Sequence, residues 1–87
     1  MKIARKAQAG TMQSSDLMVQ LAPAETLTVT IESTVLKQFG DLIRARVDLV
    51  LARNDITTGD VRITDRGALD YAIAARIETA VRRAAQE

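Results

Sequence analysis

The chain has 87 residues, enough for one small domain, and its 12 Lys and Arg nearly balance its 11 Asp and Glu, leaving a net charge of +1. Such a balance carries no electrostatic signature of a nucleic-acid or membrane partner. The sequence contains no Cys and no His, which excludes disulfides, thiolate or imidazole metal sites and the usual general bases near neutral pH. We therefore expect one domain over residues 1–87 that has no catalytic residues of its own and binds no metal.

The sequence also carries no pattern that would direct the chain to a membrane. The longest apolar run, residues 47–52, contains Asp48 and is far too short to cross a bilayer. A basic segment opens the chain, but no apolar stretch follows it as it would in a signal peptide. The cytoplasm is the expected location.

The first third of the chain is predicted to form strands. Leu17, Val19 and Leu21 recur with a period of two up to Pro23, which indicates a half-buried strand. Residues 7–12 are expected to pair with it as a short strand. The polar stretch between the two strands, Gln13-Ser14-Ser15-Asp16, is then the connecting turn, since Ser and Asp favour local bonds to the backbone.

A cleaner strand is predicted over residues 26–31, where three Thr alternate with Leu27, Val29 and Ile31. The threonine face is either solvated or a docking surface, and the sequence does not decide between the two. Ser33 or Thr34 is a candidate N-cap for a following helix that stops near Asn54. The residues predicted to form the buried stripe of this helix are Val35, Phe39, Leu42, Ile43, Val47 and Val50.

The last third is predicted to contain a short strand over residues 61–64 and a second helix capped by Asp65. The apolar residues expected to bury that helix are Leu69, Ile73, Ile77, Ala80, Val81 and Ala84. The element order is then β-β-β-α-β-α. We predict an α+β fold: a small, mostly antiparallel sheet of about four strands with two helices packed on one face.

The turn over residues 10–16, Gly-Thr-Met-Gln-Ser-Ser-Asp, is the main candidate for a functional site. On the simplest interpretation it is an ordinary hairpin loop, in which Gly gives backbone freedom and Asp16 stabilises the turn. On the functional interpretation it presents a primary hydroxyl on an exposed tip. Without a neighbouring base that hydroxyl is a poor nucleophile, but it can accept a group that a modifying enzyme attaches.

The sequence resembles the acyl carrier (gamma) subunit of citrate lyase along nearly its whole length. The matching blocks are Met1-Lys2-Ile3, residues 9–19, Lys37-Gln38-Phe39-Gly40-Asp41-Leu42-Ile43-Arg44, Asp65-Arg66-Gly67-Ala68-Leu69-Asp70 and Ala75-Arg76. The resemblance implies that the first serine of a G-T-x-x-S-[GS]-D pattern, Ser14, carries the prosthetic group. Ser15 is the rival site, but family members often have glycine at that position.

The resemblance also implies the chemistry. The arm in this family is 2'-(5''-phosphoribosyl)-3'-dephospho-CoA, joined through a phosphodiester, and its thiol holds acetyl and citryl groups. The implied partners are a prosthetic-group transferase and two subunits of citrate lyase. The alpha subunit exchanges acetyl for citrate, and the beta subunit cleaves the citryl group to oxaloacetate. Nucleic acid and membranes are not expected partners. Family members often have a further tail after Glu87, so a partner contact made there stays open.

Three alternatives remain at this stage. The carrier subunit of malonate decarboxylase uses the same type of arm, although the blocks at residues 37–40 and 65–69 favour citrate lyase. An unmodified scaffold domain is the second alternative, and a small nucleic-acid-binding module is the third. Stacking aromatics on a sheet would mark the third, but Phe39 and Tyr71 fall on predicted helices. Basic Arg76, Arg82 and Arg83 either form a solvated face or meet the acidic arm.

Overall fold

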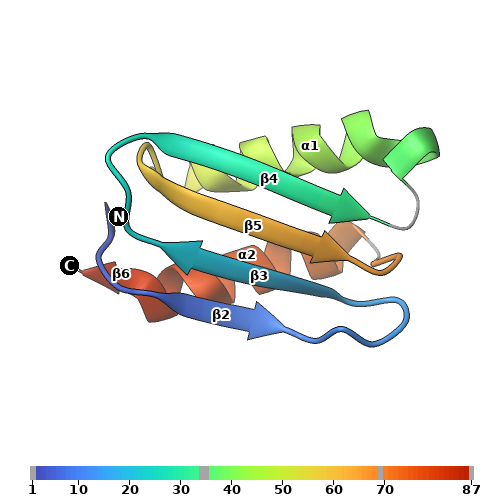
Figure 1. Ribbon diagram of the computed structural model, residues 1–87, viewed down its shortest axis with the longest axis horizontal. Coiled ribbons are helices and arrows are strands. Elements are labelled where there is room, and N and C mark those ends of the chain that lie inside the picture. The colour runs from blue at the N-terminus through green and yellow to red at the C-terminus, as the bar shows by residue number, and fades with distance from the viewer. Residues whose placement is uncertain (1, 34–35, 69, 87) are drawn as a thin grey trace.

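The computed structural model describes residues 2–33, 36–68 and 70–86. Its strands and helices follow the predicted order, with one additional short strand near each end of the chain (Figure 1). The elements are β1 (Lys2–Ile3), β2 (Ala7–Gly10), β3 (Leu17–Ala22), β4 (Leu27–Ser33), α1 (Leu36–Arg53), β5 (Gly59–Asp65), α2 (Asp70–Ala84) and β6 (Ala85–Gln86).

The main sheet has four strands in the order β2-β3-β5-β4. Strands β2 and β3 form an antiparallel hairpin, and β3 also pairs antiparallel with β5. Strands β4 and β5 are parallel, because α1 carries the chain back along the sheet between them. Both helices lie behind the sheet in Figure 1 and cover the same face. The predicted α+β class, with a mostly antiparallel sheet and two helices on one face, is confirmed.

The core is aliphatic and lies between the sheet and the helices. Strands β3 and β5 are central, and alternate residues of both point into the core because side chains alternate across a strand. The strand residues buried there are Leu17, Val19, Leu21, Val61 and Ile63, and the helix residues are Ile43, Val47, Val50, Leu51, Ile73, Ile77, Ala80, Val81 and Ala84. Tyr71 contributes nothing to this core, since it is 72% exposed.

The predicted stripe of α1 is correct in part. Ile43, Val47 and Val50 are buried, but Leu42 is 68% exposed, so its predicted burial is wrong. At about 100° per residue, Leu42 lies well around the helix from Val47 and faces away from the core. The structure buries Leu51 in its place. Residues 34, 35 and 69 lie outside the described residues, as does the side chain of Phe39.

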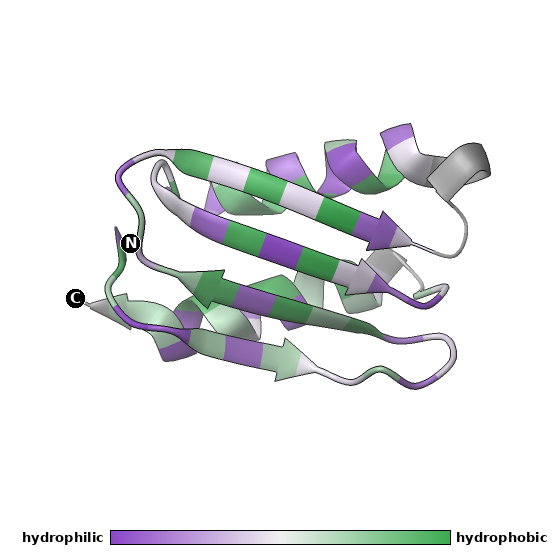
Figure 2. Cartoon of the chain, viewed as in Figure 1, coloured by the Kyte–Doolittle hydropathy of each residue, from purple (hydrophilic) through white to green (hydrophobic). Residues whose placement is uncertain are grey.

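The face of the sheet opposite the helices is open and polar. Gln8, Gln20, Arg62 and Thr30 form a row across all four strands of the main sheet, and each is exposed. Figure 2 shows the alternation: hydrophobic bands alternate with near-neutral ones along most of β4 and with hydrophilic ones along β5. The predicted threonine face is therefore solvent-exposed in this chain. Among the described residues, no helix is long and apolar enough to span a membrane.

Strands β1 and β6 were not predicted. They pair antiparallel, Lys2 opposite Gln86 and Ile3 opposite Ala85, and form a small second sheet. Each has two residues, too few for a periodic pattern to show in the sequence. The pairing brings the two ends of the chain together at one end of the molecule, opposite the β2–β3 loop (Figure 1).

Candidate functional site

The predicted turn between β2 and β3 is a tight loop at the tip of the hairpin. It begins at Gly10, whose φ of 98° lies in a region that favours glycine. A Cβ at this position would clash with the Leu17 carbonyl oxygen. The Thr11 amide donates to that same carbonyl at 3.2 Å. A β-turn follows, closed by the Asp16 amide donating to the Gln13 carbonyl at 3.2 Å. Its two central residues are the candidate serines 14 and 15.

The two serines differ in how the backbone holds them. Ser15 has a φ of 65°, the left-handed conformation that turns of this kind usually give to glycine. Its amide donates to the Arg66 carbonyl at 2.8 Å, and the Arg66 amide donates to the Asp16 carbonyl at 2.8 Å. The Ser15 side of the turn is thereby tied to the β5–α2 loop. Ser14 makes no such contact with the described residues of the β5–α2 loop through its amide.

Ser14 is exposed, and its hydroxyl has no hydrogen-bond partner among the described residues. The nearest carboxylate in sequence, Asp16, is engaged elsewhere, so no described group accepts the serine proton. A hydroxyl in this setting is a weak nucleophile by itself. It is, however, accessible from solvent and presented on a fixed turn, which suits it as the acceptor in a modification that another enzyme performs.

Asp16 holds the loop together. Its carboxylate accepts hydrogen bonds from the Thr11 hydroxyl at 2.5 Å and from the Leu17 amide at 2.7 Å. The Arg76 guanidinium of α2 donates to both carboxylate oxygens, Nε to Oδ1 at 3.2 Å and Nη2 to Oδ2 at 3.0 Å. These donors, led by Thr11 and Leu17 and joined by the charge of Arg76, lower the pKa of Asp16 to about 2 against an opposing effect of burial. The carboxylate is therefore ionised at neutral pH.

Sequence reasoning missed the role of Arg76. It left Arg76 as part of a solvated face or as a contact of the arm, whereas the structure places it on Asp16, 60 positions away in the chain. No local pattern marks a pairing over that separation. Of the other two arginines, Arg82 is exposed and Arg83 donates to the Gln8 carbonyl at 2.8 Å. Neither is brought to the Ser14 loop by a hydrogen bond within the described part of the chain.

A second aspartate, Asp65, fixes the neighbouring β5–α2 loop. It is 2% exposed, and it accepts hydrogen bonds from the Ser33 hydroxyl at 2.7 Å and from the Gly67 and Ala68 amides at 3.2 and 2.9 Å. The prediction that Asp65 caps the second helix is wrong, because Asp65 is the last residue of β5 and α2 begins at Asp70; its carboxylate instead fixes the turn between them. Arg66, the residue after Asp65, is hydrogen-bonded to Ser15 and Asp16, so Asp65 supports the β2–β3 loop indirectly.

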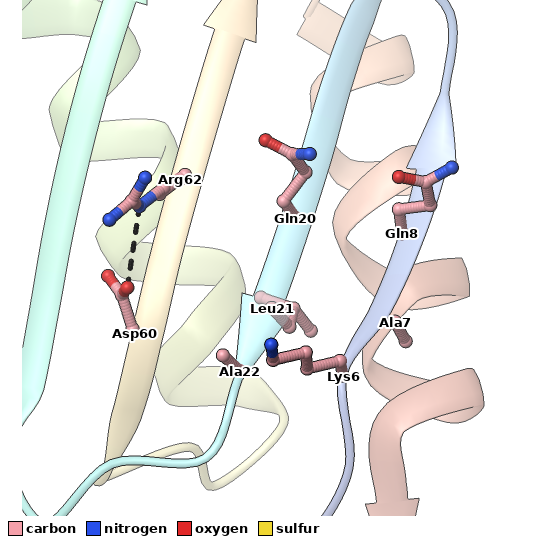
Figure 3. Close-up of a pocket in the computed structure, with 8 residues that line it drawn as sticks. All are labelled: Lys6, Ala7, Gln8, Gln20, Leu21, Ala22, Asp60 and Arg62. Atoms are coloured by element: carbon pink, nitrogen blue, oxygen red, sulfur yellow. Dashed lines mark ion pairs between the residues drawn. The ribbon is translucent and has the colours of Figure 1, made fainter.

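A shallow depression elsewhere on the molecule is the other candidate site. It lies on the open face of the sheet, where Lys6, Gln8 and Gln20 face the Arg62–Asp60 ion pair of 3.4 Å (Figure 3). The register places Ala22 opposite Asp60 and Ala7 opposite Leu21, at the end of the sheet away from the β2–β3 loop. Its charged side chains are two cations, Lys6 and Arg62, and one carboxylate, Asp60. We assign it no role.

An exposed serine without a neighbouring base, on a hydrogen-bonded turn of a small α+β domain, suits the attachment of a group by another enzyme. Comparison with known proteins supports this interpretation. Residues 4–84 match a family model for acyl carrier proteins described as the malonate decarboxylase delta subunit (MdcD). The citrate lyase acyl carrier protein of Albidiferax ferrireducens is 51% identical over 95% of this chain and 87% of its own length. That of Cronobacter sakazakii is 52% identical over 99% and 90%.

The chain therefore belongs to the family of citrate lyase acyl carrier proteins, as its sequence blocks indicated. A solved structure has the same fold. One chain of a Pseudomonas malonate decarboxylase hetero-tetramer in complex with malonate superimposes with a TM-score of 0.84, covering 95% of this chain and 87% of that one. The two sequences are 19% identical, so this likeness concerns the fold alone.

Proposed function

We propose that this protein is the acyl carrier subunit of a cytoplasmic citrate lyase complex, and that Ser14 carries its prosthetic group through a phosphodiester bond. The observation that supports this most directly is the Ser14 hydroxyl, which is exposed and without a partner among the described residues at the tip of a pinned turn. The family relationship supports the carrier role, and the relatives take their names from citrate lyase.

The residues present fit such a group. The attachment oxygen must be accessible to a modifying transferase, and the exposed Ser14 hydroxyl is. It needs no neighbouring base, because the transferase supplies the chemistry. The group itself, 2'-(5''-phosphoribosyl)-3'-dephospho-CoA, supplies a thiol to which acyl groups attach, a function that no side chain of this cysteine-free sequence provides. The chain holds the attachment point in place. The partners acting on the arm are the transferase, the alpha subunit and the beta subunit.

The geometry favours Ser14 over Ser15 as the attachment residue. Ser15 occupies the left-handed position of the turn and its amide is bonded to the neighbouring loop. Glycine suits that position better than serine, so we infer that a hydroxyl there is dispensable. The backbone conformation of Ser14 does not favour glycine, because its φ is not positive.

The experiment is intact-mass analysis and peptide mapping after co-expression with the cognate transferase. Wild type is compared with Ser14→Ala, Ser15→Ala and Ser15→Gly. A mass gain equal to the arm, absent only from Ser14→Ala, is the expected result. A gain that survives Ser14→Ala contradicts the assigned site. An unmodified wild type, with a transferase active on a known carrier, contradicts the carrier proposal and leaves the scaffold alternative.

Carriage of acyl groups for malonate decarboxylase is the second candidate. The description of the matching family model favours it. Reconstitution separates the two: the modified chain is mixed with carrier-depleted partner subunits of each complex, and cleavage of citrate or decarboxylation of malonate is followed. Activity only with the citrate lyase subunits is expected. Activity only with the malonate decarboxylase subunits would reverse the assignment.

A further inference from the structure

Helix α1 has a second apolar stripe that the core does not use. Its buried face is made of Ile43, Val47, Val50 and Leu51. On the opposite side Leu42 is 68% exposed and Leu49 is 43% exposed, and they are among the few large apolar side chains exposed in the described part of the chain. The exposed stripe consists of Leu42, Ala45, Leu49 and Ala52.

The spacing of this stripe, three residues and then four, is that of a coiled-coil seam. Leu42 and Leu49 occupy the a positions of two successive heptads, and Ala45 and Ala52 occupy the d positions. Small d residues permit close approach of a second helix. Single exposed apolar residues need no explanation, but a heptad seam on the solvent side of a helix fits a partner helix.

The charges beside the seam indicate which partner and which orientation. Asp41 and Asp48 line one flank, at the g positions, and Arg46 and Arg53 line the other, at the e positions. In a parallel pair of identical helices, each g residue faces the e residue five positions further along the other helix. Asp41 then faces Arg46 of the second copy, and Asp48 faces its Arg53. In an antiparallel pair like charges would meet across both flanks.

We propose that α1 is an interface for a second copy of this chain, with the two α1 helices side by side and parallel. The surface is self-complementary in charge in this orientation alone, which is what a two-fold symmetric interface requires. The seam, from Leu42 to Ala52, is about 16 Å long at 1.5 Å per residue. A seam of two heptads buries less than the roughly 800 Å² per partner of stable dimers. The dimer is therefore weak and forms at high local concentration.

The intrahelical ion pair of Asp48 is compatible with the pairing. Arg44 donates from Nε to both oxygens of Asp48 at 3.1 and 3.2 Å, and both side chains are 53% exposed. This ion pair leaves the Asp48 carboxylate at the surface, where it can also contact Arg53 of the second copy. Exposed pairs of this kind are worth little individually. They set orientation, while the leucines supply the affinity.

The parallel arrangement has a geometric result for the loops. Helix α1 begins after the end of β4, where Ser33 lies beside Asp65 and Asp65 lies beside Leu17. The N-terminus of α1 is therefore at the same end of the molecule as the β2–β3 loop (Figure 1). Two parallel copies present both Ser14 loops at one end of the dimer, and antiparallel copies would present them at opposite ends.

The first test is sedimentation of the unmodified full chain over a wide concentration range. The average mass of wild type is expected to rise toward that of a dimer, and Leu42→Lys with Leu49→Lys should remain monomeric. Leu27→Lys is the matched control, since Leu27 is 40% exposed on β4 and lies off the seam. A wild type that stays monomeric at millimolar concentration overturns the proposal, as does an equal loss in the control.

The second test exchanges charges between copies. Asp48→Arg alone and Arg53→Asp alone each place like charges across both symmetric contacts, and each should weaken dimerisation about tenfold. An equimolar mixture of the two variants restores opposite charges at these contacts and should regain wild-type affinity. Misfolding cannot produce that rescue. A mixture as weak as its components overturns the parallel pairing.

The third test reads orientation by disulfide formation, which the cysteine-free sequence makes simple. In a glutathione redox buffer, Leu42→Cys should cross-link to itself far faster than the exposed off-seam control Gln20→Cys. Preferred cross-linking of Leu42→Cys to Ala52→Cys in a mixture indicates antiparallel helices and contradicts the proposal. Because the unmodified chain is used, none of these outcomes bears on the attachment of a group to Ser14.

Discussion

Two neighbouring loops at the Ser14 end of the molecule are each held by one aspartate, and they are held differently. In the β2–β3 loop, Asp16 has a side chain that is 15% exposed and an arginine partner from a distant helix. In the β5–α2 loop, Asp65 is 2% exposed and receives a hydroxyl and two backbone amides. One carboxylate is held by a cation together with neutral donors, and the other by neutral donors alone.

The difference shows how each loop depends on its surroundings. A buried carboxylate satisfied by neutral donors leaves several polar groups unpaired when it is removed, and that cost does not depend on salt. A carboxylate near the surface with a cation partner is sensitive to pH and ionic strength. The ion pair of the loop that presents Ser14 therefore makes that loop sensitive to ionic strength, whereas the β5–α2 loop to which it is hydrogen-bonded has an aspartate with neutral donors only.

Removal of Asp65 should have the largest effect. Asp65→Ala leaves the Ser33 hydroxyl and the Gly67 and Ala68 amides without their acceptor in a buried site. We expect the free energy of unfolding to fall by about 3 kcal/mol, and the midpoint of thermal unfolding by more than about 10 °C. Chemical and thermal denaturation measure this. Asp60→Ala on the same strand, whose ion-pair partner Arg62 has a 67% exposed side chain, is the control and should change stability by less than about 1 kcal/mol.

Asp16→Asn should have a smaller effect that depends on pH. The pKa of Asp16 is lowered in the folded protein from 3.8 to about 2, so its ionisation stabilises the fold above pH 4 and that contribution is lost as the pH falls toward 2. Over that window, wild type should lose up to about 2 kcal/mol more stability than the variant. Urea denaturation at a series of pH values measures the difference. Identical acid profiles would show that the loop does not depend on this charge.

Arg76→Gln should have a smaller effect again. The Arg76 side chain is 40% exposed, so its ion pair with Asp16 is screened by solvent, and we expect a loss of roughly 0.5–1 kcal/mol that shrinks as salt is added. The pKa of Asp16, followed by NMR, should rise only partway because Thr11 and Leu17 still donate to it. Arg82→Gln, an exposed change on the same helix, is the control. A full return of the Asp16 pKa to its ordinary value would contradict the donor order inferred for this carboxylate.

The smallest effect is expected at the turn itself. Ser15→Gly relieves the left-handed conformation of Ser15 and should raise the free energy of unfolding by about 0.5 kcal/mol. Ser14→Gly is the matched change one residue earlier, where φ is not positive, and it should lower stability by a similar amount. Denaturant midpoints of the two variants should therefore move in opposite directions. Shifts of the same sign would argue against the turn geometry.

The elements of the fold were predictable where a pattern repeats. Leu17, Val19 and Leu21 form a strand with one buried face, and Ile73 to Ala84 form a buried helical stripe, as their spacing indicated. The stripe of α1 was harder because apolar residues lie on two sides of that helix. Periodicity alone assigned Leu42 to the core, and only the packing of α1 on the sheet shows which side is buried.

The site was predictable in its local part. The turn, the exposure of Ser14 and the stabilising role of Asp16 follow from residue types that favour turns. The support from Arg76 and from the Arg66 backbone was not predictable, because these contacts form only when α2 and β5 are placed beside the hairpin.

The antiparallel pairing of β1 with β6 places Lys2 and Gln86, near the two ends of the chain, side by side. Both ends of the chain emerge together, while the β2–β3 loop lies at the far side of a body that measures 35 Å along its longest axis (Figure 1). A partner bound near either end of the chain therefore holds the domain at the end furthest from the hairpin tip. A small rotation of the domain about the β1–β6 end displaces the hairpin tip over a large distance. The length of the domain therefore adds to the reach of a group attached at the tip.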